Sequence, residues 1–191
     1  MKNVNQHLTH WQQQVAADAH NATAWFNLGW WSNKAGLFTQ AVKAYEQSLA
    51  CGVSDPEEAM SNLASVYSER LANPVAAAQW LDRALETYPN YYPVVFNRAH
   101  LAEQTGDREL ACQLFGRAAA LSPDDPYALA RLVEADPMLT LASAAGQKLS
   151  ELAKDNADAL MALCRLQERE GHYASAWESL VQANELDRRA L

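Results

Sequence analysis

The 191-residue sequence contains no isoleucine and has only 10 valines and 6 threonines. Because β-branched residues favour strands, their scarcity excludes a protein built on a large β-sheet. Glycine and proline number only seven each, which excludes collagen-like and low-complexity sequences. What the chain has in abundance is 36 alanines and 24 leucines, which are strong helix formers. We therefore expect an all-α fold.

Positive charge is also in short supply, with 15 Lys and Arg against 23 Asp and Glu and a formal net charge of −8. This balance lacks the basic surface that nucleic acids and anionic membranes attract. No apolar run is long enough for a signal peptide or a membrane span. Cys51, Cys112 and Cys164 lie more than 50 residues apart, so they form no disulfide framework and favour a reducing compartment. We expect a cytoplasmic protein.

An internal repeat of 34 residues is present. Pro89 and Pro123 close two similar stretches, 82–89 and 116–123. One copy of the repeated pattern consists of Trp25, Leu28, Gly29, Gly36, Phe38, Ala41, Tyr45 and Leu49. Another consists of Val95, Ala99, Ala102, Gly106, Ala111, Phe115, Ala118 and Pro123. The order of large, small and aromatic residues resembles the tetratricopeptide repeat (TPR) family, whose unit is a pair of antiparallel helices.

The resemblance covers nearly the whole chain and implies a right-handed TPR superhelix, an α-solenoid of antiparallel helix hairpins. An N-terminal capping helix in residues 1–21 precedes five predicted repeats, 22–56, 57–91, 92–125, 126–156 and 157–191. The second repeat has one extra residue in its inner turn. The fourth is three residues short and irregular.

Helix boundaries can be predicted from local chemistry. Asp or Asn followed by Pro is typical of an N-cap and a first helical residue, and this pair occurs at 55–56, 73–74, 125–126 and 136–137. In the fourth repeat, the pattern predicts that the first helix ends near Ala135 and that the second begins at Pro137. Glycine at repeat position 15 predicts a left-handed residue at the end of each first helix.

No catalytic motif is present: the sequence has no phosphate-binding glycine loop, no nucleophile elbow and no H-E-x-x-H. His7 and His10 share a helix face, but two ligands without a neighbouring carboxylate or thiolate do not make a metal site. The cysteines fall at repeat positions that small apolar residues usually occupy, which favours packing over reactivity. We expect no enzymatic activity, no metal and no cofactor.

The TPR resemblance implies a concave groove lined by the first helix of each repeat. Asn27, Asn62 and Asn97 occupy position 6 of the first three repeats, and Arg131 occupies it in the fourth. Because an amide both donates and accepts hydrogen bonds, a row of asparagines can bind the main chain of an extended peptide. The alternative is that Asn at position 6 is simply common in the family.

Four ring side chains flank these asparagines and are candidates for holding peptide side chains: Phe26, Trp30, Phe96 and His100. Packing between repeats is the alternative role for them, and for Trp31 it is favoured. In the fifth repeat, the groove positions are Asp158, Met161, Arg165, Glu168 and Arg169.

The leading prediction is a non-enzymatic scaffold that binds an extended peptide or a partner helix in the TPR groove. A second reading comes from residues 129–132 and 183–189, which resemble the TPR region that precedes the catalytic domain in some bacterial sulfotransferases. The chain would then be an accessory region of a larger bacterial enzyme. A third reading is a homodimer formed through the uncapped last repeat, by Tyr173, Trp177, Leu180 and Leu186.

Overall fold

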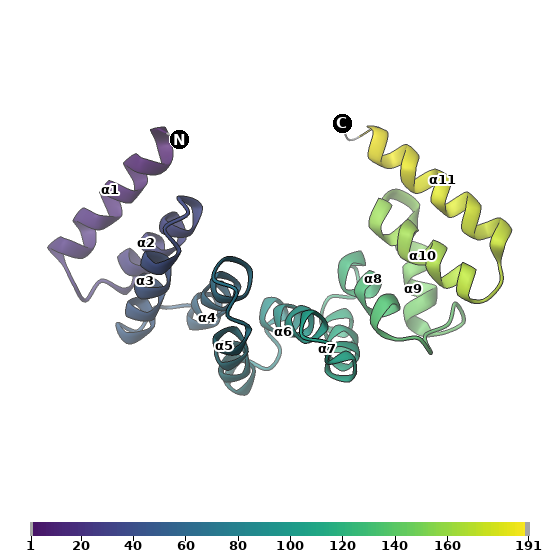
Figure 1. Ribbon diagram of the computed structural model, residues 1–191, viewed down its shortest axis with the longest axis horizontal. Helices are drawn as coiled ribbons and strands as arrows, with labels where there is room; N and C mark the ends of the chain where they lie inside the picture. Colours follow the sequence, from purple (N-terminus) through teal and green to yellow (C-terminus); the bar gives the residue numbers. More distant parts are fainter. Residues whose placement is uncertain (1, 190–191) are drawn as a thin grey trace. The chain divides into compact units, whose positions relative to one another are not determined.

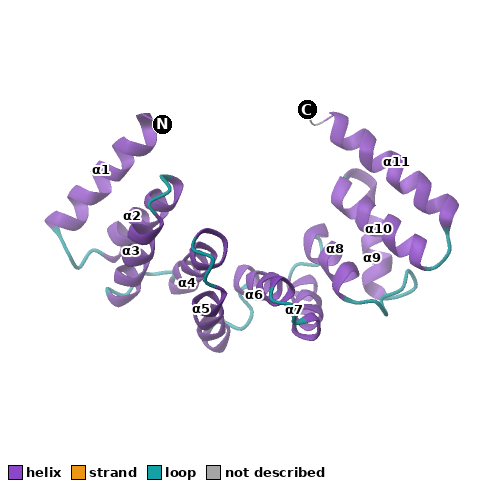
Figure 2. Ribbon diagram, viewed as in Figure 1, coloured by secondary structure: helices purple, strands orange, loops and turns teal. Residues whose placement is uncertain are grey.

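Helices make up all the regular structure of residues 2–189, which are the residues that the computed structural model describes (Figure 2). A single helix, α1 (Lys2–Ala17), comes first, and the helices that follow come in successive pairs along the chain (Figure 1). The pairs are α2 (Ala22–Lys34) with α3 (Phe38–Ala50), α4 (Pro56–Ser65) with α5 (Pro74–Thr87), α6 (Tyr92–Gln104) with α7 (Arg108–Leu121), α8 (Pro126–Ala135) with α9 (Ala144–Leu152), and α10 (Ala157–Arg169) with α11 (Tyr173–Arg189). The predicted all-α fold is confirmed.

The chain divides into two compact units, Met1–Leu101 and Ala102–Leu191, and the division falls inside α6. We call them the N-terminal unit and the C-terminal unit. The first contains α1 to α5 and most of α6, and the second contains α7 to α11.

Three of the predicted helix starts are confirmed, and at two of them the side chain of the Asp or Asn caps the helix, whereas that of Asp55 makes no capping bond. Helices α4, α5 and α8 each begin at the proline that follows an Asp or Asn. The side chain of Asn73 accepts a hydrogen bond from the Ala76 amide at 3.1 Å, and that of Asp125 accepts one from the Tyr127 amide at 2.9 Å. These bonds satisfy amide groups that have no partner inside the helix.

The glycines at repeat position 15 have positive φ angles, at 78° for Gly36, 84° for Gly106 and 82° for Gly171. The left-handed turn that was predicted after α2, α6 and α10 is therefore confirmed. Residues with a Cβ rarely adopt this conformation, which is why glycine ends these helices.

Small residues stand where paired helices approach most closely. A Cβ on Gly29 would lie 2.9 Å from the ring of Tyr45, so α2 and α3 can meet only because Gly29 has no side chain. Four second helices carry an alanine at the same repeat position, and each of these alanines is buried: Ala41, Ala77, Ala111 and Ala176. The high alanine content thus sets the spacing of the hairpins.

Helix α1 packs on the first hairpin. Its Leu8 is buried together with Leu28 of α2 and Ala44 of α3, and Trp11 lies against the same cluster. The ring of His7 stacks on that of Trp31 with centroids 3.9 Å apart. The predicted packing role of Trp31 is confirmed, and His7 uses its ring in the same contact.

The extra residue of the second repeat is accommodated by a π-helical turn, η1 (Val66–Arg70), which continues α4. Here the Leu71 amide donates to the Val66 carbonyl, five residues back, at 3.1 Å. A single inserted residue commonly widens a helix in this way. The turn then passes through Ala72, whose φ of 50° is the one positive value at a non-glycine residue in the described part of the chain.

The prediction for the fourth repeat is half correct. Helix α8 ends at Ala135 as expected, but α9 begins at Ala144 and not at Pro137. The Asp136 carboxylate accepts from the Met138 amide, two residues on, at 2.8 Å. That short-range bond closes a turn instead of starting a helix. Ser143 is the true N-cap of α9, with its hydroxyl accepting from the Gly146 amide at 3.1 Å.

The segment between α8 and α9 folds back on the start of α9 because of Gly146. A Cβ at this position would collide with the Thr140 carbonyl oxygen and with the backbone of Leu141. Glycine thus permits two stretches of backbone to approach each other directly.

Candidate functional site

Asn27 lies half-buried on α2, and its side-chain amide is already engaged. Its Nδ2 donates to the Thr23 carbonyl, one turn earlier in the same helix, at 2.8 Å. The Oδ1 atom is left to accept a hydrogen bond from outside the helix.

Asn97 of α6 is bonded to the neighbouring first helix, α4. Its Nδ2 donates to the hydroxyl of Ser61 at 2.9 Å and lies 3.5 Å from that of Ser65. Ser61 is 4% exposed, so the bond satisfies a buried hydroxyl. Asn97 therefore holds α4 and α6 side by side within the N-terminal unit.

Asn62 of α4 is half-buried as well, but within residues 2–189 its side-chain amide makes no hydrogen bond. The reason lies in the preceding repeat. The positions equivalent to the Ser61 and Ser65 partners of Asn97 are occupied there by Phe26 and Trp30, whose side chains offer no acceptor oxygen. Three asparagines with one repeat position thus have three different hydrogen-bond environments.

Two of the predicted aromatic anchors lie on α2 and differ in exposure. Phe26 is half-buried and packs edge-to-face on Tyr45, with ring centroids 5.6 Å apart. Trp30 is 38% exposed, packs edge-to-face on Trp31 at 4.7 Å, and has the Lys34 ammonium 5.3 Å from its ring centroid. Trp30 offers an open aromatic face, while Phe26 contributes mainly to the hairpin core.

The other two predicted anchors lie on α6 and are half-buried. The ring of Phe96 stacks on that of Tyr92, one turn earlier, at a centroid distance of 5.7 Å and an interplanar angle of 28°. His100 lies one turn further along the same helix. Tyr92, Phe96 and His100 follow one another at intervals of four residues and form a stripe on α6 beside that of Asn97.

Arg131 of α8 is committed to ion pairs within the C-terminal unit. One of its terminal nitrogens bonds Glu103, at the end of α6, and the other bonds Glu134 at 2.6 Å. Glu134 also bonds Arg165 of α10 through its second oxygen. The result is a chain of alternating charges, with side chains of Glu103, Arg131 and Glu134 each between 27% and 30% exposed.

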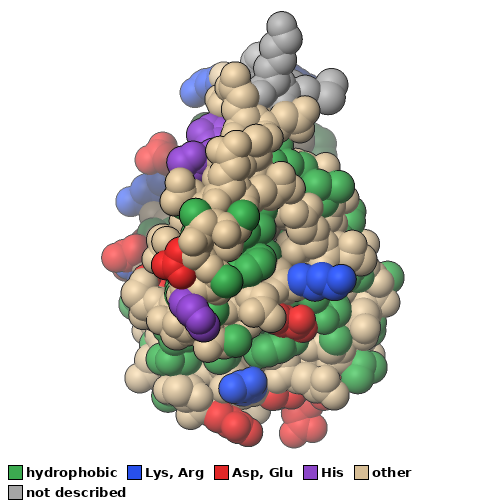
Figure 3. All heavy atoms as spheres, turned by 90° about the vertical axis from the view of Figure 1, so that its left-hand side faces the viewer, with side chains coloured by type: hydrophobic (Ala, Val, Ile, Leu, Met, Phe, Trp, Pro, Cys, Tyr) green, Lys and Arg blue, Asp and Glu red, His purple; other side chains and the backbone are tan. Residues whose placement is uncertain are grey.

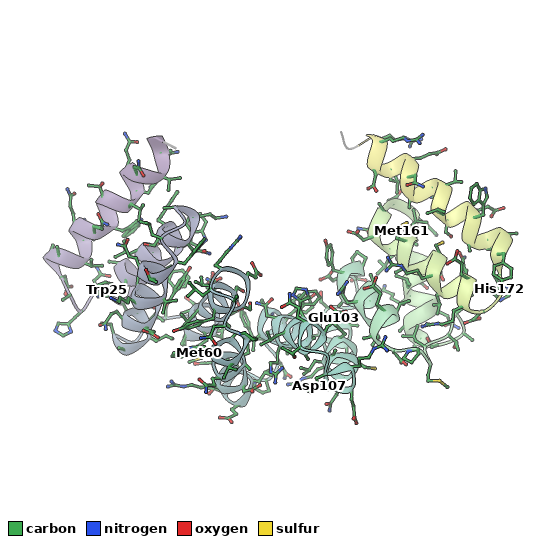
Figure 4. The ribbon with its side chains drawn as sticks, viewed as in Figure 1. Trp25, Met60, Glu103, Asp107, Met161 and His172 are labelled. Carbon is green, nitrogen blue, oxygen red and sulfur yellow. The ribbon has the colours of Figure 1, made fainter. Side chains whose placement is uncertain are left out.

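A cleft of about 250 Å³ opens beside these ion pairs, between α8 and α10. Figure 4 labels Glu103, which belongs to the ion-pair chain, at the end of α6. It also labels Met161 of α10, which forms part of the cleft wall. The cleft is lined by polar and apolar side chains together: Tyr127, Ala130, Arg131, Glu134, Asp158, Met161, Ala162 and Arg165.

Arg169 was expected in the groove, but it holds the segment after α8 in place. Its guanidinium donates to the carbonyls of Val133 at 3.3 Å, Asp136 at 3.1 Å and Leu139 at 2.8 Å. The neighbouring Glu170 accepts from the Leu141 amide at 2.5 Å. Sequence reasoning missed this role because it depends on residues about 30 positions away.

The charged side chains on the face shown in Figure 3 are mixed in sign. Lys and Arg lie scattered among Asp and Glu with apolar side chains between them, and neither sign gathers into a patch. Burial raises the pKa of the Cys112 and Cys164 thiols, assisted by the negative charges of Asp136 and Glu168 respectively. A raised pKa reduces the thiolate fraction and hence the reactivity of both cysteines.

Across residues 2–189, no three His, Cys, Asp or Glu side chains are arranged to hold a metal ion. Among the helices of that range, none combines the length and the apolar composition that crossing a membrane requires.

Residues 92–125 match a family model described as tetratricopeptide repeat, and this is the range of the third predicted repeat. Together with the helix pairs, the match identifies an all-helical repeat protein with the TPR fold. A comparison with curated proteins gave no match.

Solved structures share the fold at low sequence identity. PilF of Pseudomonas aeruginosa has a TM-score of 0.75 at 19% identity, covering 97% of this chain and 85% of its own. PilW, described as a widely conserved type IV pilus biogenesis factor, has a TM-score of 0.68 at 20% identity, covering 100% and 92%. YrrB, described as a TPR protein with an unusual peptide-binding site, has a TM-score of 0.60 at 18% identity, covering 93% and 84%. The predicted sulfotransferase resemblance is not shown by these comparisons.

Proposed function

We propose that this protein is a non-enzymatic interaction scaffold that binds an extended peptide along the first helices of its N-terminal unit. The binding face consists of α2, α4 and α6, which carry Asn27, Asn62 and Asn97. The fold it shares with YrrB, for which a peptide-binding site is described, supports the same kind of activity here.

Asn62 is the observation that carries this proposal. Its half-buried amide has no hydrogen-bond partner among the described residues, so its donors and its acceptor are open to an outside ligand. A peptide main chain supplies both the donor and the acceptor that this amide lacks. Asn62 therefore contributes most of the sequence-independent hydrogen bonding to the peptide.

Asn27 and Asn97 assist with their carbonyl oxygens. Their Nδ2 atoms are occupied by Thr23 and Ser61, so each offers an acceptor for a peptide N–H. Trp30, which is more exposed than Phe26, the other predicted anchor on α2, takes an apolar or aromatic peptide side chain.

The test uses peptides selected from a random phage-displayed library on the full chain, with affinities measured by fluorescence anisotropy. We expect Asn62→Ala to weaken binding by about five- to tenfold, which corresponds to one or two hydrogen bonds. Thermal stability should stay unchanged, because the amide makes no hydrogen bond with any of residues 2–189.

Asn90→Ala is the matched control, since Asn90 is exposed in the turn before α6. It should leave the affinity unaltered. Asn97→Ala provides a second comparison: it should lower stability by about 1 kcal/mol, because Ser61 loses its partner. Equal affinities for the original chain and the Asn62→Ala variant would contradict the proposal.

We also propose self-association through α11, because this helix exposes a row of large apolar side chains. Tyr173, Trp177 and Val181 are 71%, 66% and 40% exposed and follow one another at intervals of four residues. They form one apolar stripe on the helix surface, which a second copy of the chain would bury.

Sedimentation over a range of concentrations tests this second proposal. The original chain should show a concentration-dependent mass, and Trp177→Gln should shift the dimer dissociation constant upward by about tenfold or more. Val75→Gln is the control, because Val75 is 67% exposed but lies on α5. A monomeric mass at every concentration would refute self-association.

We further propose the cytoplasm as the compartment. All three cysteines are free, and Cys164 is buried, which suits a reducing environment.

A further inference from the structure

The cleft between α8 and α10 lies wholly in the C-terminal unit, so its chemistry can be considered independently of the asparagine face. Its volume of about 250 Å³ suits a single large side chain better than a folded element. The charges and surfaces around it determine which side chain fits.

The positive charges of the cleft are already neutralised. Arg131 bonds two carboxylates, Glu103 and Glu134, and Arg165 bonds the second oxygen of Glu134. An anionic ligand would have to compete with Glu134, which is held between both guanidinium groups. The arrangement therefore disfavours an anion.

Asp158 is different, because it has no counter-charge. It lines the cleft from the first turn of α10, and its carboxylate makes no ion pair or hydrogen bond with any residue from 2 to 189. The positive end of the helix dipole favours a carboxylate there but supplies only a partial charge. With Glu103 included, the site holds three carboxylates against two guanidinium groups.

Apolar and aromatic surfaces stand next to this carboxylate. Met161 and Ala162 of α10 contribute aliphatic surface, and Tyr127 of α8, which is 55% exposed, contributes an aromatic ring. Aliphatic surface covers the methylene groups of a long basic side chain, while an aromatic ring and a carboxylate attract its cationic end.

We propose that this cleft binds a lysine or arginine side chain of a partner polypeptide, with Asp158 as the counter-ion and Tyr127 as the aromatic wall. The net negative charge of the chain, −8, draws such basic partners toward it.

The test is an NMR titration of the full chain with capped single residues: N-acetyl-lysine methylamide, N-acetyl-arginine methylamide, and the norleucine and glutamate equivalents. The two basic compounds should shift the amide signals around Tyr127 and Asp158, and binding should weaken as salt is raised. Norleucine should bind several-fold more weakly. Tighter binding of the glutamate compound would overturn the proposal.

n-Butylamine distinguishes a polypeptide from a small amine. It carries one ammonium group on the four-carbon chain of a lysine side chain but has no peptide bonds, so we expect it to bind more weakly than the capped lysine. Equal or tighter binding would contradict the assignment to a polypeptide partner.

Two variants separate a cation site from an anion site. Asp158→Asn should weaken binding of the lysine compound by about fivefold, whereas Asp155→Asn, the matched control outside the cleft, should not. Arg165→Gln should strengthen binding of the lysine compound, because Glu134 then loses one of its two cations and its negative charge is less neutralised. Weaker binding of the lysine compound by the Arg165→Gln variant would overturn the proposal. So would an unchanged affinity of the Asp158→Asn variant for that compound.

Discussion

Identical residues at one repeat position acquire different chemistry from their neighbours. Asn27 bonds its own helix, Asn97 bonds the serines of the adjacent helix, and Asn62 bonds nothing within the described chain. The sequence pattern predicts three equivalent side chains, because spacing says nothing about the partners that surround each one. It follows that substitutions along this row should differ in their effects on stability and on binding.

The Tyr45 hydroxyl leads to a prediction at the same scale. Tyr45 is fully buried, and its hydroxyl has no hydrogen-bond partner among residues 2–189. Burial, assisted by the negative charge of Glu58, raises the pKa of this phenol, so it stays protonated at ordinary pH.

Tyr45→Phe keeps the ring that packs on Gly29 and removes the unsatisfied hydroxyl. We expect the free energy of unfolding to stay unchanged or to rise by up to about 1 kcal/mol, as measured by urea denaturation. A loss of more than 1 kcal/mol would show that the hydroxyl has a partner in solution.

At the scale of single elements, the turn after the π-helical segment carries strain. Ala72 has a φ of 50°, where the turns after α2, α6 and α10 use glycine. An alanine in the left-handed conformation costs roughly 1 kcal/mol or more. Replacing it by glycine relieves this strain, but the unfolded glycine has more conformational freedom, which offsets part of the gain in stability.

Ala72→Gly should therefore raise the free energy of unfolding by about 0.5–1 kcal/mol, measured by thermal or urea denaturation. Ala50→Gly serves as the opposite control, because Ala50 ends α3 with an exposed side chain in a helical residue. It should be neutral or destabilising. A loss of stability in Ala72→Gly would contradict the strain argument.

The segment between α8 and α9 depends on one side chain from another element. Arg169 donates to two carbonyls of this segment, those of Asp136 and Leu139, where the sequence predicts a helix. It also donates to the Val133 carbonyl in the last turn of α8. Arg169→Met removes the donors while it keeps a long apolar side chain. We expect stability to fall by about 1–2 kcal/mol, and residues 136–143 to be cleaved faster by protease.

Arg188→Met is the control for that experiment, since Arg188 is exposed near the end of α11. It should change neither stability nor cleavage measurably. If the Arg169 variant is cleaved at the original rate, the segment is held by other contacts.

At the scale of the whole molecule, the described residues form several local cores within the two units. Buried clusters join neighbouring elements, such as α4 with α5 and α6, or α1 with α2 and α3. In such a protein, stability is nearly a sum of local contributions, and damage to one repeat spreads mainly to the next.

Gly146→Ala tests this locality, because its Cβ would collide with the backbone at Thr140. We expect hydrogen exchange to accelerate by about tenfold or more in α8, α9 and α10 while protection in α2 and α3 stays unchanged. Mass spectrometry of exchanged peptides measures both regions in one experiment. A uniform loss of protection over the whole chain would show that it unfolds as a single unit.

Much of the architecture could be predicted without coordinates. Alanine and leucine content, the 34-residue period, the Asp-Pro and Asn-Pro pairs and the glycines at position 15 are local signals. They act through backbone sterics and capping, which depend on residues a few positions apart. For that reason the all-α fold and three of the four Pro-marked helix starts were predicted correctly, while the start at Pro137 was not.

The tertiary structure alone decided which polar side chains have partners. The serines next to Asn97, the carbonyls around Arg169 and the two arginines on Glu134 are brought together from separate helices. Hydrogen bonds and ion pairs require contact within about 3–4 Å, and only the packing of distant segments sets such distances. The sequence by itself determined the repeats and their helices, whereas the free amide of Asn62 and the uncompensated carboxylate of Asp158 emerged only once those helices were packed.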